Sequence, residues 1–138
     1  MKRLHVNVSV KDLNESINFY NALFKMEPTV VKKDYAKWLV EDPSVNFSII
    51  LNPADTGVKH LGIEAETASE LQDVYQNIEK TKAAVDEEGH TVCCYAQSEK
   101  SWVEDPQGVE WEAFHTYGEA DTIKENAKTD CCESTCCS

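Results

Sequence analysis

The sequence predicts an α+β fold in which a βαβββ module occurs twice, and three observations predict it. A strand-like segment that alternates apolar and polar residues, HVNVSV at 5–10, is followed by residues with a helical spacing of apolar side chains. The same succession returns from HLGIEA at 60–65, at one constant offset along the chain. The segments WLVEDPSVNFSI (38–49) and WVEDPQGVEWEA (102–113) also resemble each other, so the ends of the modules repeat as their beginnings do.

The first module is expected at residues 1–53. Its opening strand at 3–10 has one apolar and one polar face, which is the pattern of a sheet with one face buried. A helix is expected at 12–25, because Asp12 and Glu15 have the spacing of a capping box, in which side chains satisfy free amides at a helix start. The remaining strands of this module are expected at 27–32, 35–41 and 45–51.

The second module, residues 54–117, follows the same plan. Its opening strand is expected at 58–65. Thr67 and Glu70 repeat the capping-box spacing, which predicts a helix at 68–85. The remaining strands of this module are expected at 90–95, 99–104 and 109–115.

The length and charge of the chain limit its organisation and its partners. Two small modules that share one core fit the 138 residues, so residues 1–117 are expected to form a single domain. Residues 118–138 lack a periodic apolar face and are expected to form a flexible, cysteine-rich tail. A formal net charge of −12 argues against nucleic acid and anionic membranes as partners. The expected partners are therefore small molecules.

Two further features bear on location and assembly. The N-terminus enters a strand pattern directly, without the apolar region of a signal peptide, and no apolar run is long enough to cross a bilayer. A cytoplasmic location is expected, and the six cysteines are then expected to be thiols. Because one chain carries both modules, it can complete a site alone, which fits a monomer; a homodimer is the alternative.

Two histidines and one glutamate are candidate metal ligands. His5 and His60 occupy equivalent places on the polar faces of the two opening strands, and Glu112 lies in the last predicted strand. Two imidazoles and one carboxylate are the donor set of non-haem Fe(II) oxygenases, which keep coordination positions open. The alternative interpretation is that all three are ordinary polar strand residues.

A family resemblance rests on these residues. The duplicated modules, His5 and His60 on their first strands, and DPQGVEWE at 105–112 resemble the vicinal oxygen chelate superfamily, which includes glyoxalase I, bleomycin- and fosfomycin-resistance proteins and extradiol dioxygenases. The resemblance implies a curved, cup-shaped sheet with a metal inside, held by His5, His60 and Glu112. Ser48 stands at the fourth ligand position and is a poor ligand, so a three-ligand site with open coordination is implied.

Two adjacent thiols point to one group within this superfamily. Cys93 and Cys94 lie within TVCCYAQSEKSW at 91–102. A disulfide between neighbouring residues would be strained, so two thiolates that hold a soft ligand are the better interpretation. Together with the two-histidine, one-glutamate set, this segment resembles the organoarsenical C–As lyases and the related cadmium-induced proteins. That resemblance implies that Cys93 and Cys94 bind trivalent arsenic.

The same resemblance implies an activity. The chain is expected to be an Fe(II)-dependent dioxygenase that uses O₂ to remove the organic group of trivalent organoarsenicals such as methylarsonite, which yields arsenite and an aldehyde and confers resistance. Because neighbouring strand residues point to opposite faces, both thiols converge only if residues 93–95 bulge or turn. A loop that begins near Cys94 is expected to close over the iron.

Other residues near the thiols receive weaker predictions. Trp102 is expected to contact an organic group, and Gln97 and Lys100 are expected in the closing segment. His90 and His115 are expected to have surface or packing roles.

The tail carries two more vicinal pairs, in CCESTCC at 131–137. The pairs are Cys131 with Cys132 and Cys136 with Cys137. A flexible tether raises the local concentration of what it binds, so these thiols could deliver arsenic to the site. The alternatives are a dispensable tail that binds soft metals incidentally, and a zinc site, although the spacing is not that of a zinc finger.

Two functions of other classes compete with the lyase. A non-catalytic protein could sequester arsenic or cadmium through its thiols, but His5, His60 and Glu112 then have no role. A glyoxalase-like, metal-dependent isomerase would need a fourth ligand at Ser48 and would leave Cys93 and Cys94 unexplained.

Overall fold

The computed structural model describes residues 1–93 and 96–119, and for 87–93, 96–98 and 117–119 it describes the main chain only. The elements are β1 Arg3–Val10, α1 Leu13–Phe24, β2 Val30–Lys32, β3 Tyr35–Val40, β4 Val45–Leu51, β5 Gly57–Ala65, α2 Ala68–Thr81, β6 Val85–Cys93, β7 Ala96–Glu104 and β8 Glu110–Glu119. Within these ranges no helix has the length and apolar character needed to span a membrane.

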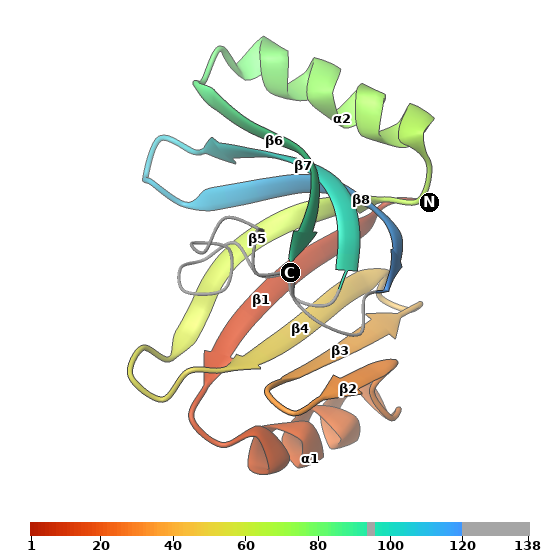
Figure 1. Ribbon diagram of the computed structural model, residues 1–138, viewed down its shortest axis with the longest axis vertical. Helices are drawn as coiled ribbons and strands as arrows, with labels where there is room; N and C mark the ends of the chain where they lie inside the picture. The colour runs from red at the N-terminus through yellow and green to blue at the C-terminus, as the bar shows by residue number, and fades with distance from the viewer. Residues whose placement is uncertain (94–95, 120–138) are drawn as a thin grey trace.

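The strands of the described chain form one curved, eight-stranded sheet in the order β2-β3-β4-β1-β5-β8-β7-β6 (Figure 1). β1 pairs in parallel with β4, and β5 pairs in parallel with β8. The two halves meet where β1 and β5 pair antiparallel, so the strand order of one half is the mirror of the other. We call this β1–β5 junction the seam. The predicted α+β fold with two βαβββ modules and a curved sheet is confirmed.

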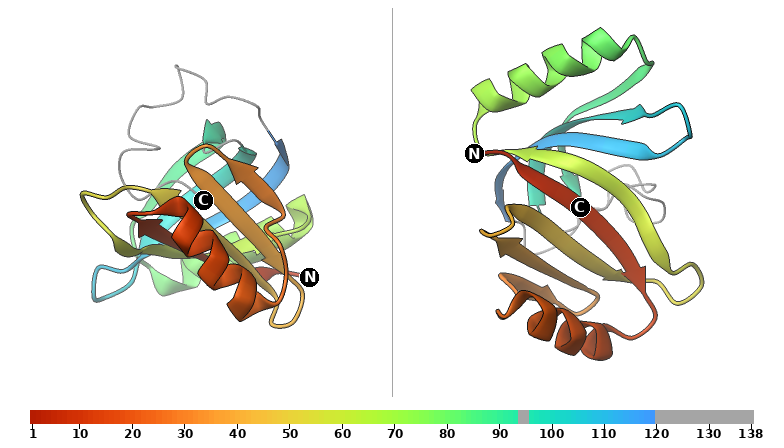
Figure 2. Two further views of the ribbon diagram at one scale, coloured as in Figure 1. Left: turned by 90° about the horizontal axis from the view of Figure 1, so that it is seen from below. Right: turned by 180° about the vertical axis from the view of Figure 1, so that it is seen from behind.

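The helices cover the apolar face of each half and lie at opposite ends of the molecule (Figures 1 and 2). α1 contacts β3 and β4, while α2 contacts β5 and β8. Each half has its own hydrophobic cluster beneath its helix. In the first half it is built on Val10, Ala36, Trp38, Val40, Val45, Phe47 and Ile49, and in the second on Ala65, Leu71, Val74 and Ala113. The opposite face of the sheet is left for the polar side chains.

Both predicted helix starts are confirmed. The Asp12 side chain accepts a hydrogen bond from the Glu15 amide at 2.9 Å, and the Thr67 hydroxyl accepts one from the Glu70 amide at 3.1 Å. These bonds satisfy amides that have no partner inside the helix. The duplication in the sequence therefore marks two equivalent helices.

The predicted boundaries of three elements, α2, β6 and β2, are wrong. α2 ends at Thr81 and not at 85, because Lys82 takes a left-handed conformation (φ 60°) that stops the helix. β6 begins at Val85 and not at 90, in a segment whose acidic residues hide the strand pattern. β2 begins at Val30 and not at 27, since Pro28 cannot donate a ladder hydrogen bond.

The hairpin that ends the second half also differs from prediction. Cys93 pairs with Ala96, so β7 begins three residues earlier than the predicted 99. β8 continues through Glu119, so the strand passes the predicted domain boundary at 117. The predicted strand residues 94–95, and the predicted tail from 120 onwards, lie outside the described residues.

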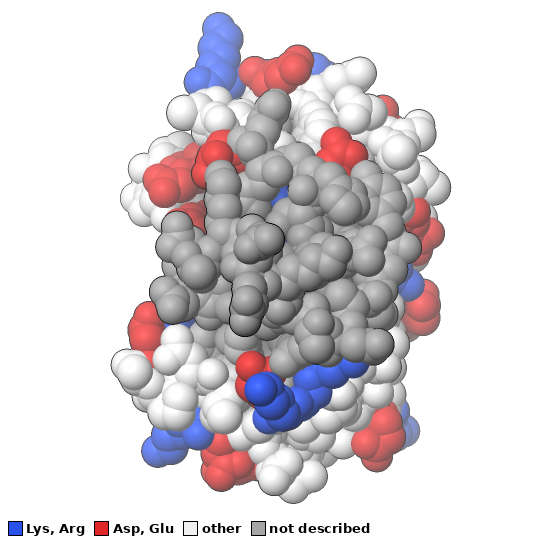
Figure 3. Space-filling view, viewed as in Figure 1, with Lys and Arg blue, Asp and Glu red and all other residues white. Residues whose placement is uncertain are grey.

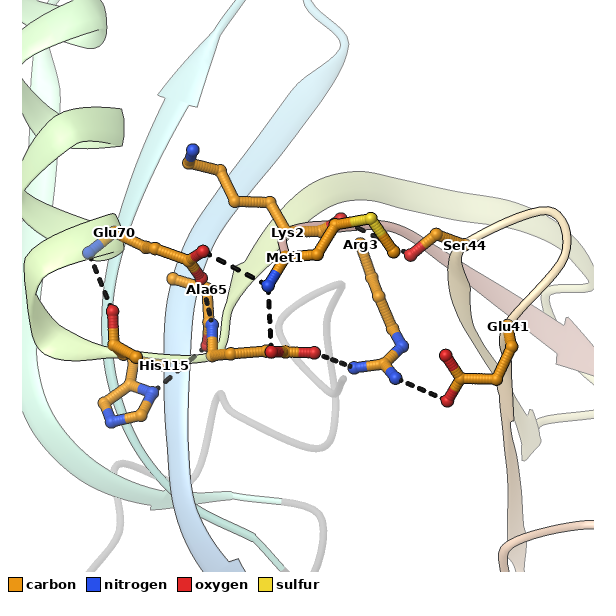
Figure 4. A network of polar contacts seen from close by, with 10 residues as sticks. Met1, Lys2, Arg3, Glu41, Ser44, Ala65, Glu70 and His115 are labelled. Atoms are coloured by element: carbon orange, nitrogen blue, oxygen red, sulfur yellow. Dashed lines mark hydrogen bonds and ion pairs between the residues drawn. The ribbon is translucent and has the colours of Figure 1, made fainter.

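A network of ion pairs at the N-terminus joins the two halves (Figure 4). The Arg3 guanidinium contacts Glu41 of the first half at 2.8 Å and Glu66 of the second at 3.0 Å. The amino group of Met1 lies 2.9 Å from Glu66 and 3.2 Å from Glu70. Elsewhere on the face seen in Figure 3, acidic side chains are spread over the described surface.

Candidate metal centre

Three neighbouring strands supply the three predicted ligands. His5 lies on β1, His60 on β5 and Glu112 on β8. His5 pairs across the seam with Gly62, and Gly62 pairs with Glu112, so these residues form one row across the sheet. His60 lies diagonally from His5 on the same face, two residues from Gly62. The duplicated histidines meet because β1 and β5 are the strands that form the seam.

The ligand atoms lie close together and are shielded from solvent. The Nε2 atoms of His5 and His60 are 3.0 Å apart, and His60 Nε2 lies 3.2 Å from Glu112 Oε2. One donor atom from each of the three residues lies within 4.8 Å of the others. Two nitrogens bound to one ion at about 2.1 Å and at about a right angle lie about 3 Å from each other. The geometry and the donor set therefore fit a divalent transition metal.

The protonation states also suit metal binding. Burial lowers the pKa of His5 to about 4, although the charge of Glu112 opposes this. Burial raises the pKa of Glu112, but the nearby Lys100 ammonium and the His60 ring, whose Nε2 lies 3.2 Å from Glu112 Oε2, outweigh it and bring that pKa to about 2. At neutral pH His5 is neutral and Glu112 is ionised, which are the states that bind a cation.

A glycine makes room for Glu112. A Cβ atom at Gly62 would lie 2.5 Å from the Glu112 carbonyl oxygen, which is a clash. In the first half, the residues in the corresponding places are Asn7 and Ser48, and they pair across β1 and β4. The Asn7 amide donates to the Ser48 hydroxyl at 2.9 Å, and both residues are buried. Ser48 therefore already has a protein partner at the position where a fourth ligand would stand.

Two residues of β7 adjoin the ligands. Lys100, which is 1% exposed, places its ammonium 3.4 Å from Glu112 Oε1. The Trp102 ring lies edge-on to His60 with ring centroids 5.0 Å apart. Both residues were predicted near the thiols. Their place beside Glu112 and His60 could not be predicted, because it depends on the register of β7 with β8.

Three further buried polar residues on the same face of the sheet as the ligands were not predicted. Asn46 contacts His5 through its main-chain and side-chain oxygens, and Glu64 and Lys37 are buried on the same face. Buried nitrogens beside the centre, His60 Nδ1 and Trp102 Nε1, have no hydrogen-bond partner within the described part of the chain. The register of β4 with β1 places Asn46 opposite His5, and the repeat alone did not reveal it.

The other predicted residues have mixed outcomes. His115 has the predicted packing role, since its Nδ1 lies 3.1 Å from the Ala65 carbonyl oxygen. Only the main chains of His90, Cys93 and Gln97 are described. The remaining predicted thiols fall outside the described residues, namely Cys94, Cys131, Cys132, Cys136 and Cys137.

Comparison with known proteins gives close relatives in sequence. A Bacillus subtilis (strain 168) protein named probable trivalent organoarsenical cleaving enzyme is 40% identical over 135 residues, which are 95% of this chain and 91% of that protein. A trivalent organoarsenical cleaving enzyme from Bacillus sp. (strain MD1) is 40% identical over 99% of this chain and 83% of its own. The cadmium-induced protein CadI of Mycobacterium tuberculosis (strain H37Rv) is 30% identical over 99% and 93%.

Solved structures agree on the fold. The Mn(II)-bound glyoxalase from Novosphingobium aromaticivorans matches with a TM-score of 0.60 at 15% identity, over 93% of this chain and 44% of that one. The family model described as Glyoxalase/Bleomycin resistance protein/Dioxygenase superfamily matches residues 2–113. Because this family model covers most of the chain and the relatives in sequence are up to 40% identical, the chain belongs to the glyoxalase/bleomycin resistance protein/dioxygenase superfamily.

Proposed function

We propose that this protein is an Fe(II)-dependent dioxygenase that cleaves the C–As bond of trivalent organoarsenicals such as methylarsonite. The observation that carries the proposal is the buried cluster of His5, His60 and Glu112 in a chain 40% identical to proteins named for organoarsenical cleavage. A cytoplasmic detoxification role and a small-molecule substrate follow from this proposal.

The donor set favours an iron site with open coordination positions over an isomerase site in which a fourth protein ligand binds the metal. Two neutral imidazoles and one carboxylate suit Fe(II) and leave coordination positions for other molecules. The fourth ligand position holds Ser48, which is not acidic and is hydrogen-bonded to Asn7, so the first half offers no fourth ligand. Bound Fe(II) would supply the activation of O₂. His5, His60 and Glu112 would hold it, and the buried rings of Trp102 and Phe114 beside the histidines would exclude water.

The overall reaction balances without another reductant. Methylarsonous acid, CH₃As(OH)₂, and O₂ contain the same atoms as arsenous acid, As(OH)₃, and formaldehyde, CH₂O. The C–As bond, one C–H bond and the O–O bond break, and an As–O, an O–H and a C=O bond form, so the hydrogen lost by carbon ends on the new As–OH group. The carbon gives up the four electrons that O₂ accepts. Both oxygen atoms enter the products, which is the stoichiometry of a dioxygenase.

Cys93 and Cys94 are the proposed arsenic ligands. Trivalent arsenic with one carbon substituent has two exchangeable positions, and two thiolates can fill them. Thiolate is the soft donor that a soft centre prefers over carboxylate or imidazole. Cys93 is the last residue of β6, where its main chain pairs with Ala96, and Cys94 lies outside the described residues. The four tail cysteines are proposed to deliver arsenic to this thiol pair.

The test is a reconstitution with defined metal and oxygen. The apoprotein is loaded with Fe(II) without air, methylarsonite is added, air is admitted, and the arsenic species are separated by chromatography. His60→Ala and Cys93→Ser run alongside, with His115→Ala as a control for a histidine that packs against Ala65. The expected result is arsenite and formaldehyde in equal amounts from the wild type and the control.

Two results would contradict the proposal. Tight arsenical binding with the methyl group retained, unaffected by His60→Ala, would indicate a sequestering protein. Arsenite formation that persists without iron or without oxygen would exclude dioxygenase chemistry.

A further inference from the structure

We propose that a cavity between α2 and the sheet, on the face opposite the metal centre, is a second binding site that takes an organic cation with an aromatic body. The inference goes beyond the proposed function and does not depend on it. It starts from a difference between the two halves in how the helix lies on its strands.

α2 lies one strand closer to the seam than α1 does. α1 mainly contacts β3 and β4, whose counterparts in the second half are β7 and β8, but α2 mainly contacts β5 and β8. In the first half the Trp38 ring of β3 packs against Tyr20 and Phe24 of α1, with ring centroids 5.7 and 6.1 Å apart. The repeat places Glu79 of α2 where α1 has Phe24, so α2 has a carboxylate in place of one of these rings.

The strand beneath α2 has also lost its aromatic partner. Trp111 of β8 corresponds to Phe47 of β4 in the repeat. The β7 residue that pairs with Trp111 is Val103, whereas the β3 residue that pairs with Phe47 is Trp38. A valine therefore stands where the first half has an indole. The aromatic contacts that hold α1 over β3 are not available to hold α2 over β7, and the space above this strand stays open.

This space is a cavity of about 590 Å³. Its walls are apolar on both sides: the sheet contributes Ile63, Val103, Trp111 and Ala113, and α2 contributes Val74 and Ile78. Sites for small molecules commonly have volumes of about 300–1,000 Å³ and mostly apolar walls. The cavity therefore has the size and the lining of a site for a small organic molecule.

The cavity is separate from the metal centre. Glu112 lies between Trp111 and Ala113 on β8, and successive strand residues point to opposite faces of a sheet. The Glu112 carboxylate contacts His60 on the polar face, while its two neighbours line the cavity. A molecule in the cavity would lie behind the strand that carries a metal ligand, on the other side of the sheet from the metal.

The charged residues at the cavity favour a cation. Its lining includes two carboxylates, Glu104 and Asp105, against one ammonium, Lys2. Glu104 pairs across β7 and β8 with Glu110, so negative charge gathers at this end of the strands, in a chain of net charge −12. The Trp111 ring strengthens the preference, because cations are attracted to the face of an indole. An aromatic body would fill the apolar space while its positive group meets the carboxylates.

The test measures the binding of a styrylpyridinium dye, an aromatic molecule with a permanent positive charge, by fluorescence anisotropy. The full chain is loaded with Co(II), which reports its own binding by visible absorption. The uncharged styrylpyridine of the same shape is the matched ligand. The dye is expected to bind more tightly than the uncharged compound. Glu104→Gln should weaken dye binding about threefold, the effect of one exposed ion pair, and leave the uncharged compound unaffected.

Two variants fill the cavity with side chains that the first half already uses. Val103→Trp introduces the side chain of Trp38. Ala113→Ile introduces that of Ile49, which pairs with β1 as Ala113 pairs with β5. Each should weaken dye binding about tenfold or more and retain Co(II) binding. Val58→Trp is the matched control, because Val58 is 65% exposed and is not among the lining residues.

The outcomes distinguish this inference from the proposed function. A wild type that does not bind the dye, or cavity-filling variants that bind it as well as the wild type, would overturn the site. Ala113→Ile keeps this comparison valid if Val103→Trp does not fold. Equal binding of the charged and uncharged compounds would overturn the preference for a cation.

His60→Ala separates the two sites. It should lose Co(II) binding and keep dye binding. Loss of both would place the dye at the metal centre and overturn the cavity as its site. A wild type that binds the dye but binds Co(II) no better than His60→Ala would instead overturn the metal site on which the proposed function rests.

Discussion

Glycine 62 and Glu112 lie side by side on β5 and β8, with no space for a side chain at position 62. The contact that forbids a Cβ atom is with the main chain of β8, which cannot move away as a flexible side chain could. The distance between these two strands also sets the distance between His60 and Glu112. The smallest possible change at this position should therefore act on both stability and metal binding.

Gly62→Ala is expected to destabilise the protein by about 1–3 kcal/mol, the usual cost of forcing atoms into a packed site. It should also weaken Co(II) binding, because β8 must shift. Urea unfolding and Co(II) titration measure the two effects. Gly57→Ala is the control: its φ of 108° makes alanine strained, but nothing lies near the added methyl group, so Co(II) affinity should not change. Equal Co(II) affinities in Gly62→Ala and wild type would contradict the expectation.

The buried, neutral state of His5 predicts an acid-sensitive apoprotein. Its pKa of about 4 in the folded state lies below the ordinary 6.5, so between these values the unfolded chain binds a proton that the folded chain does not. Stability then falls as the pH decreases from 6.5 to 4, by up to about 3 kcal/mol. The lowered pKa of Glu112 adds a second loss between pH 4.5 and about 2.

Urea unfolding of the metal-free protein at several pH values measures this slope. The His5→Asn variant keeps a polar side chain without an imidazole, so its stability should vary less between pH 6.5 and 4. The same slope in both proteins would rule out His5 as the source.

The two halves of the sheet use the same elements but treat the fourth ligand position differently. In the second half Gly62 lies beside Glu112, whereas in the first half Asn7 lies beside Ser48 and binds it. A glutamate at 48 alone would compete with the Asn7 side chain for space. A glycine at 7 would restore the arrangement that the second half has.

The Asn7→Gly/Ser48→Glu double variant is therefore expected to add a fourth ligand. Its Co(II) affinity should rise at least tenfold, a gain of about 1.4 kcal/mol, and its oxygen-dependent activity should fall because a coordination position is filled. Ser48→Glu alone should lose stability and gain no affinity. Equal affinities of the double variant and the wild type would show that position 48 does not reach the metal.

The strands and helices that repeat were the ones the sequence predicted well. Both copies carry the same alternation and the same capping residues, and the structure confirms both helix starts. The errors lie where local signals conflict with tertiary structure, as at β6, whose acidic start is poorly suited to a strand in isolation. His5 and His60 could be predicted because they occupy the same position in the two copies of the repeat. Asn46, Glu64 and the place of Lys100 depend on strand register, which a single sequence does not carry.

At the scale of the whole molecule, the candidate centre bridges the seam. His5 comes from the first half, while His60 and Glu112 come from the second. Arg3 joins the same halves through Glu41 and Glu66. A bound ion therefore ties together the two halves of one fold and must act on the stability of both.

Metal should raise the unfolding temperature of the entire protein in one transition. At a free metal concentration 100 times the Kd, the expected stabilisation is about 2.7 kcal/mol. Differential scanning calorimetry with Co(II) measures the shift, and His60→Ala should abolish it. A shift confined to one of two separate transitions would mean that the halves unfold independently.

The seam has one more consequence. The connection from β4 to β5 is short, residues 52–56, and no candidate ligand lies in it. If the chain were cut there, His5 would lie on one polypeptide and His60 with Glu112 on the other. The two pieces would retain the complementary β1 and β5 edges, and a metal ion would become the agent that holds them together. Fused to the halves of a fluorescent protein, such pieces would make a sensor for that ion.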